Sequence, residues 1–231
     1  MSSDPRTNLT FPHTWSAEIL SAPPLIAPAR QFTWPQRVPG EEDALARGAA
    51  PVGLHAERAP VERGLDVVDA DRVPGEEDAL ARGALLLQVK PASGGSFLAT
   101  CALGFRAPSA LSGVWSCPRP DDLLAIAGGY AYLANMLAPE HPLHLALRPV
   151  AQVLAAPEAN LLLLAGFHNI AAIGAAGLVW QTARLTWEGL TLTGIRDNQL
   201  HGLGWDMRTD RELPFTIDLT TGSHTGGGFN P

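Results

Sequence analysis

Short apolar runs separated by turn residues dominate the chain from position 84 onward. Two such runs, 85–89 and 97–105, flank the segment PASGG at 91–95, a pattern typical of a β-hairpin. Further strands are expected at 113–117, 123–127, 130–134, 150–155, 161–166, 169–173, 177–185, 190–195, 199–205 and 214–219. Many short strands with closely spaced turns predict an all-β fold with mainly antiparallel pairing.

The first 36 residues differ from this body in their proline content. Prolines at positions 5, 12, 23, 24 and 28 argue against a long helix. The same stretch holds large apolar residues, among them Phe11, Trp15 and Trp34. We therefore expect 1–36 to be an extended apolar arm with one edge strand that packs on a single β domain covering 1–231. The body of that domain is expected over about 84–226.

An identical 13-residue segment, RVPGEEDALARGA, occurs at 37–49 and again at 72–84. Identity confined to these copies indicates a recent in-frame insertion, and 48–82 is predicted to be a peripheral insertion flanked by direct repeats. Each copy begins with acidic residues and ends at glycine, as short helices do. One or two short N-terminal helices are therefore expected.

A second periodicity appears in the body of the domain. Gly128, Gly166 and Gly204 are 38 residues apart, and so are Asp122, Asn160 and Asn198. The intervening segments repeat a turn, an apolar strand and a glycine. In this respect residues 113–226 resemble the blade repeats of β-propellers, which implies a small propeller-like stack of about 38-residue units. An ordinary β-sandwich with evenly spaced hairpins is the alternative.

Charge and composition restrict the class of partner. The chain has 16 basic and 23 acidic residues, a formal net charge of −7, and no cluster of Lys or Arg, so a nucleic-acid partner is not expected. No apolar run is long enough to span a bilayer, and the N-terminus lacks the features of a secretory signal. Abundant Arg, Ala, Gly and Pro, with Lys90 as the only lysine, indicate a GC-rich genome. Two cysteines are too few for a disulfide framework, so we expect a bacterial, cytoplasmic protein with reduced thiols and without membrane association.

Catalytic and metal-binding motifs are weak. Cys101 lies in an apolar strand, Cys117 follows a strand end and could be accessible, and no GxSxG motif occurs. His201 and Asp206 are weak metal-ligand candidates on or beside one strand. The glycine-rich segment 221–229 is expected to be a flexible or strand-covering tail. No cofactor and no enzymatic activity are expected.

The segment 180–208 combines tryptophan with arginine, the composition of binding hot spots. A strand over 177–185 would place Trp180, Thr182 and Arg184 on one face. The candidate binding residues are Trp180, Arg184, Trp187, Trp205, Asp206 and Arg208. The sequence favours a non-catalytic β domain that binds another protein or self-associates. The alternative is a small-molecule- or carbohydrate-binding protein or a hydrolase that uses the same surface.

Overall fold

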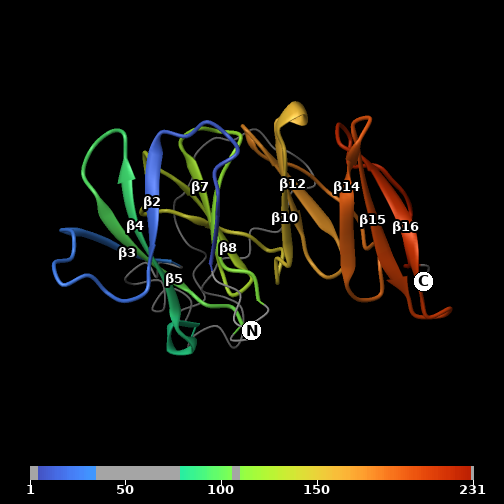
Figure 1. Ribbon diagram of the computed structural model, residues 1–231, viewed down its shortest axis with the longest axis horizontal. Coiled ribbons are helices and arrows are strands. Elements are labelled where there is room, and N and C mark those ends of the chain that lie inside the picture. The colour runs from blue at the N-terminus through green and yellow to red at the C-terminus, as the bar shows by residue number, and fades with distance from the viewer. Residues whose placement is uncertain (1–4, 35–78, 106–109, 230–231) are drawn as a thin grey trace, which may run out of the picture.

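The described residues fold into β-strands that form four separate sheets. The computed structural model describes residues 5–34, 79–105 and 110–229. Figure 1 shows the sheets side by side along the longest axis of the molecule, and we number them I to IV in that order. The all-β, mainly antiparallel class is confirmed. The four sheets form a propeller-like stack, whereas a sandwich would have two layers.

Sheet I contains strands from both sides of the sequence repeat. Its strand order is β2-β4-β5-β3. The strands are β2 (Trp15–Leu20), β3 (Arg30–Trp34), β4 (Ala84–Pro91) and β5 (Phe97–Ala102). β4 and β5 form the antiparallel hairpin expected around 91–95. β2 pairs antiparallel with β4 and β3 pairs parallel with β5, so the N-terminal arm supplies both edges of this sheet.

Sheet II also takes an edge strand from the arm. Its order is β1-β6-β7-β8-β9. The strands are β1 (Arg6–Asn8), β6 (Gly113–Ser116), β7 (Asp122–Ala127), β8 (Tyr130–Asn135) and β9 (Leu143–His144). A Cβ on Gly113 would lie 2.1 Å from the carbonyl oxygen of Arg6, so glycine is required where β1 approaches β6. The arm thus provides three edge strands where the sequence predicted one.

Sheets III and IV are antiparallel meanders in chain order. Sheet III consists of β10 (Gln152–Ala156), β11 (Leu161–Ala165), β12 (Ile170–Gly174) and β13 (Gly177–Gln181). Sheet IV consists of β14 (Leu190–Arg196), β15 (Gln199–Asp206), β16 (Arg211–Asp218) and β17 (His224–Gly226). β17 shows that the glycine-rich tail covers the edge of β16.

The strand predicted over 177–185 is too long, because it ends at Gln181. Thr182 still donates its backbone N–H to the Ile170 carbonyl at 2.9 Å. The N–H of Ile170, however, donates to the Thr182 hydroxyl at 3.1 Å. The hydroxyl replaces the threonine's own carbonyl as acceptor, and the chain leaves the sheet at this residue.

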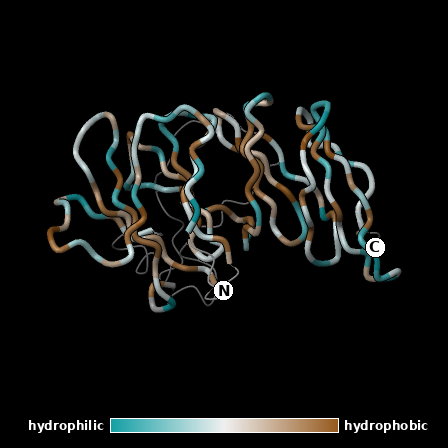
Figure 2. The backbone as a smooth tube through the Cα atoms, viewed as in Figure 1, coloured by the Kyte–Doolittle hydropathy of each residue, from teal (hydrophilic) through white to brown (hydrophobic). Residues whose placement is uncertain are grey.

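Three hydrophobic cores fill the spaces between adjacent sheets. In the two interior sheets, successive residues of one strand enter opposite cores. Leu123 faces the core between sheets I and II while Leu124 faces the core between II and III. Leu164 and Leu163 divide in the same way between the second and third cores. Figure 2 accordingly shows hydrophobic colour along the strands and hydrophilic colour at turns such as the one joining β14 to β15.

The 38-residue period corresponds to one sheet per unit. Asp122 begins β7, and Asn160 and Asn198 directly precede β11 and β15. Asn160 and Asn198 have φ angles of 53° and 60°, a left-handed conformation that asparagine tolerates in tight turns. Each repeat unit of 113–226 thus corresponds to one blade-like sheet, as the resemblance to propeller repeats implied.

The end of the second repeat copy forms the short 3-10 helix η2 (Ala79–Arg82). It ends at Gly83, whose N–H donates to the Leu80 carbonyl at 3.0 Å. The first copy and most of the predicted insertion 48–82 lie outside the described residues, so the insertion remains a prediction. No helix within the described part of the chain is both long and apolar enough to cross a membrane.

Candidate functional site

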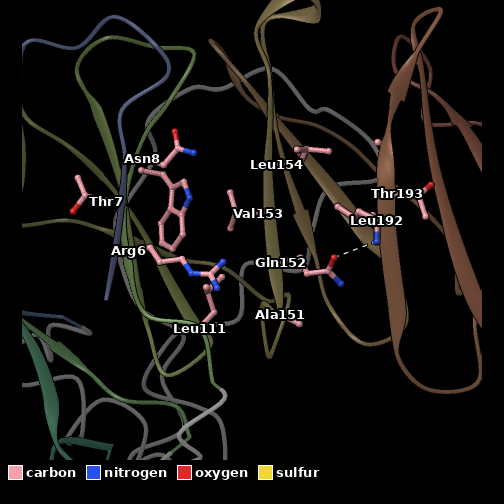
Figure 3. A pocket seen from close by; sticks show the side chains of 12 residues that line it. Arg6, Thr7, Asn8, Leu111, Ala151, Gln152, Val153, Leu154, Leu192 and Thr193 are labelled. Carbon is pink, nitrogen blue, oxygen red and sulfur yellow. Dashed lines mark hydrogen bonds between the residues drawn. The ribbon is translucent and has the colours of Figure 1, made fainter. Parts of the chain in front are cut away.

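Edge strands from three sheets border a groove on one side of the stack. Its volume is about 580 Å³, and it is lined by 6–8 of β1, 151–154 of β10 and 192–194 of β14, together with Leu111 and Trp115. Figure 3 shows β10 between β1 and β14. Each of these three strands stands at the end of its sheet, so one edge of each is unpaired by any described strand.

The part of the groove between β1 and β10 has polar and apolar sides. In Figure 3 the side chains of Arg6 and Asn8 point from β1 toward β10, and Val153 points from β10 toward β1. Trp115 pairs in register with Asn8, is only 4% exposed and belongs to the core between sheets II and III. Leu111 and Val153 pack against the same core. An aromatic and aliphatic base thus lies beside two exposed polar side chains.

The part between β10 and β14 is closed by one side chain. The Nε2 of Gln152 donates to the Leu190 carbonyl at 2.7 Å, and its Oε1 accepts the N–H of Leu192 at 3.1 Å. The amide therefore contacts the edge of β14 as a paired backbone would (Figure 3). No such hydrogen bond joins β1 to β10 among the described lining residues.

Among the described residues, Arg6 is the only ionisable side chain that lines the groove. The remaining polar groups are the hydroxyls of Thr7 and Thr193 and the amides of Asn8 and Gln152. Sequence reasoning did not find this site. Its residues come from strands far apart in the chain and share no motif. The one related prediction was that the arm would supply an edge strand, which did not indicate a groove.

Of the predicted binding residues, Trp180 is a core residue. It is 8% exposed and lies between sheets III and IV. Its Nε1 donates to the Leu219 carbonyl at 2.8 Å. Because the strand ends at Gln181, Trp180 and Arg184 do not share one strand face.

Arg184 and Trp187 do come together, in the loop between β13 and β14. The Arg184 guanidinium donates to the carbonyls of Thr186 and Trp187 at 2.9 and 2.5 Å. It lies 4.8 Å from the ring centroid of Phe229 and 5.7 Å from that of Trp187. Phe229 completes this Arg184 cluster from the C-terminal tail, a contribution that no sequence pattern indicated.

Trp205 and Asp206 end β15, and Arg208 lies in the turn that joins it to β16. The Trp205 Nε1 donates to the Asp210 carboxylate at 3.0 Å. The Asp206 carboxylate accepts the Thr209 hydroxyl at 2.7 Å and the Arg208 N–H at 3.0 Å. These bonds, that of Thr209 first, lower the pKa of Asp206 and show that its carboxylate caps the turn. The Trp205 carbonyl also accepts the N–H of Trp187, which places this turn beside the Arg184 cluster.

The metal and thiol candidates are placed in separate surroundings. His201 and Asp206 are five residues apart on β15, so their side chains project from opposite faces. Across the residues described, no three His, Cys, Asp or Glu side chains gather as a metal site would require. Cys101 and Cys117 are free and fully buried, and burial raises the pKa of both thiols. Cys117 is therefore not the accessible thiol that its strand-end position suggested.

Comparisons with known proteins give distant matches among solved structures. No protein-family model matches the chain, and no curated protein matches it. Among solved structures, the WD40 domain of SCAP from fission yeast matches with 12% sequence identity and a TM-score of 0.28. The match covers 58% of this chain and 38% of that one.

Proposed function

We propose that this chain is a non-catalytic β module that binds an extended segment of another protein in the groove between β1 and β10. The observation that carries the proposal is the set of free strand edges along the groove. An extended peptide can add to such an edge through backbone hydrogen bonds, while pockets for alternate side chains supply specificity.

The backbone of β1 is oriented for this pairing. The N–H of Arg6 donates to the Ser112 carbonyl at 3.0 Å, toward β6. Because successive peptide groups of a strand point to opposite edges, the N–H of Thr7 faces the free edge. The described lining residues supply aliphatic, aromatic, hydroxyl, amide and guanidinium groups, and none of them carries a carboxylate, imidazole or thiol. This set suits binding better than acid–base catalysis.

Only part of the Trp/Arg-rich segment 180–208 is proposed to contact the partner. Its contribution is the exposed Arg184 and the half-buried Trp187, which we assign as a secondary contact for the same partner. The guanidinium is held by two carbonyls and two aromatic rings. Little side-chain entropy would therefore be lost when a partner covers it.

A small-molecule ligand is the second candidate. A groove of about 580 Å³ with Trp115 at its base is within the usual size range of small-ligand sites. Native mass spectrometry of the purified chain separates the two functions. A bound small molecule that is lost in Asn8→Trp would favour the second candidate over the first.

The direct test is selection of random heptapeptides, displayed on phage, against the full chain. Enriched peptides are expected to bind with affinities reduced about tenfold or more by Thr7→Pro, which removes the free-edge N–H, and by Asn8→Trp, which fills the groove. Thr7→Val keeps the N–H and is the matched control, with affinity within about twofold of the wild type. If no enriched peptide is weakened by Thr7→Pro and Asn8→Trp, the proposed function is wrong.

A further inference from the structure

The groove places one positive charge beside an apolar base, and this arrangement selects among peptides. We infer that the bound segment presents the side-chain carboxylate of an Asp or Glu to Arg6, with an apolar side chain two residues away against Val153. This inference rests on the proposed function and names the chemical class of its partner.

Arg6 is positioned to act as a recognition residue. It is exposed, its side chain points into the space between β1 and β10 (Figure 3), and no ion pair involving it is present among the described residues. Within the part of the chain that the structure describes, no Asp or Glu lines the groove beside it. A guanidinium binds a carboxylate through two parallel hydrogen bonds, which makes it selective for that group.

The strand register fixes the spacing of the two contacts. Arg6 and Asn8 lie on the same face of β1, two residues apart, and Asn8 is in register with Trp115. A segment paired with the free edge of β1 places alternate side chains opposite these two positions. The side chain opposite Arg6 meets the guanidinium, and the one opposite Asn8 faces Val153 of β10, which lines the other side of the groove.

The same geometry favours a side-chain carboxylate over a chain terminus. The Arg6 side chain projects from the face of β1, whereas the backbone of a bound segment lies at its edge. A side chain at the cross-strand position reaches the guanidinium directly. A terminal carboxylate would lie along the line of the bound backbone instead.

The charge of the whole chain opposes the binding of acidic segments away from Arg6. The net charge is −7, so the average field of the protein repels an acidic segment. Attraction depends on the local cation, and we expect the contribution of Arg6 to weaken as salt is added. Replacing Arg6 should therefore alter the sequence preference of the groove more than the total amount of peptide that it binds.

The test repeats the heptapeptide selection with wild type, Arg6→Glu and the control Arg196→Glu, which reverses an exposed charge outside the groove. The wild-type and Arg196→Glu pools are expected to be enriched in Asp or Glu at one position with an apolar residue two positions away. The Arg6→Glu pool is expected to exchange that acid for Lys or Arg. In synthetic peptides, Glu to Gln at that position should weaken binding to the wild type about tenfold, and to Arg6→Gln less than about twofold.

The outcomes separate this inference from the proposed function. If peptides bind the groove and are weakened by Thr7→Pro, but acids are not enriched or persist in the Arg6→Glu pool, the carboxylate inference is wrong and the module function stands. If amidation of the peptide C-terminus abolishes binding while Glu to Gln does not, the side-chain assignment is wrong. If no groove-dependent peptide is found, both fail.

Discussion

At the scale of single residues, His144 has the most unusual environment. It is 4% exposed, and its ring stacks on Tyr132 with centroids 4.8 Å apart. Neither ring nitrogen has a hydrogen-bond partner within the described ranges. Burial, followed by the charge of Arg148, lowers the pKa of His144 to about 3. The imidazole is therefore neutral in the folded protein.

This lowered pKa predicts a pH-dependent loss of stability. The unfolded chain takes up a proton on His144 below about pH 6.5, whereas the folded chain does not until about pH 3. The free energy of unfolding should fall as the pH drops through this window, by about 2 kcal/mol from this residue at pH 5. Urea denaturation at several pH values measures the slope.

The variant His144→Phe keeps an aromatic ring against Tyr132 and removes the titrating group. We expect its stability to fall less steeply than that of the wild type between pH 6.5 and pH 4. His141→Phe changes the histidine in the loop before β9 and leaves His144 in place, so the wild-type slope should persist. Equal slopes in the wild type and His144→Phe would contradict the assignment.

At the scale of elements, edge strands are joined to neighbouring sheets by side chains. Gln152 is the clearest case, since its amide bonds both a carbonyl and an N–H on the edge of β14. Sheets III and IV are thereby tied together at the groove, in addition to the core behind them. The bond also closes that edge of β14 to an added strand near Leu192.

We expect Gln152→Ala to lower the free energy of unfolding by about 1–3 kcal/mol, because two partly buried backbone groups lose their partner. Gln181→Ala, an exposed glutamine at the end of β13, is the matched control and should stay within about 0.5 kcal/mol of the wild type. Urea denaturation compares the two. Similar losses in both variants would show that the bridge contributes little.

At the scale of the whole molecule, stability depends on the stacking of sheets. Each core lies between two adjacent sheets, and sheets II and III each contribute to two cores. Such an arrangement resembles a short repeat array in which neighbours stabilise one another. Because the interior sheets have no other apolar environment, loss of one core should weaken both of its neighbours.

Leu164→Ala tests this dependence. Leu164 is fully buried between sheets II and III, and its truncation should cost about 2–5 kcal/mol. Leu25 is 105% exposed in the β2–β3 loop, and Leu25→Ala should change stability by less than about 0.5 kcal/mol. Tryptophans lie in all three cores, so fluorescence and circular dichroism should report one shared transition in Leu164→Ala. Separate transitions would show that the sheets unfold independently.

The sequence by itself determined the class of fold and most of the strands. Apolar runs and turn residues report local backbone preference and burial, and these are properties of neighbouring residues. The hairpin around 91–95 and the period marked by Asp122, Asn160 and Asn198 were predictable for this reason. The strand over 177–185 was too long because its end depends on the Thr182 hydroxyl, which no propensity describes.

Only the tertiary structure decided where the arm strands pair and which side chains meet. β1 joins sheet II because Gly113 allows its approach, and this places Arg6 beside Val153 of another sheet. Trp180 proved to be core, while Arg184 and Trp187 met Phe229 from the tail. Contacts of this kind join residues that are distant in sequence, so they follow from sheet order and packing and leave no pattern along the chain.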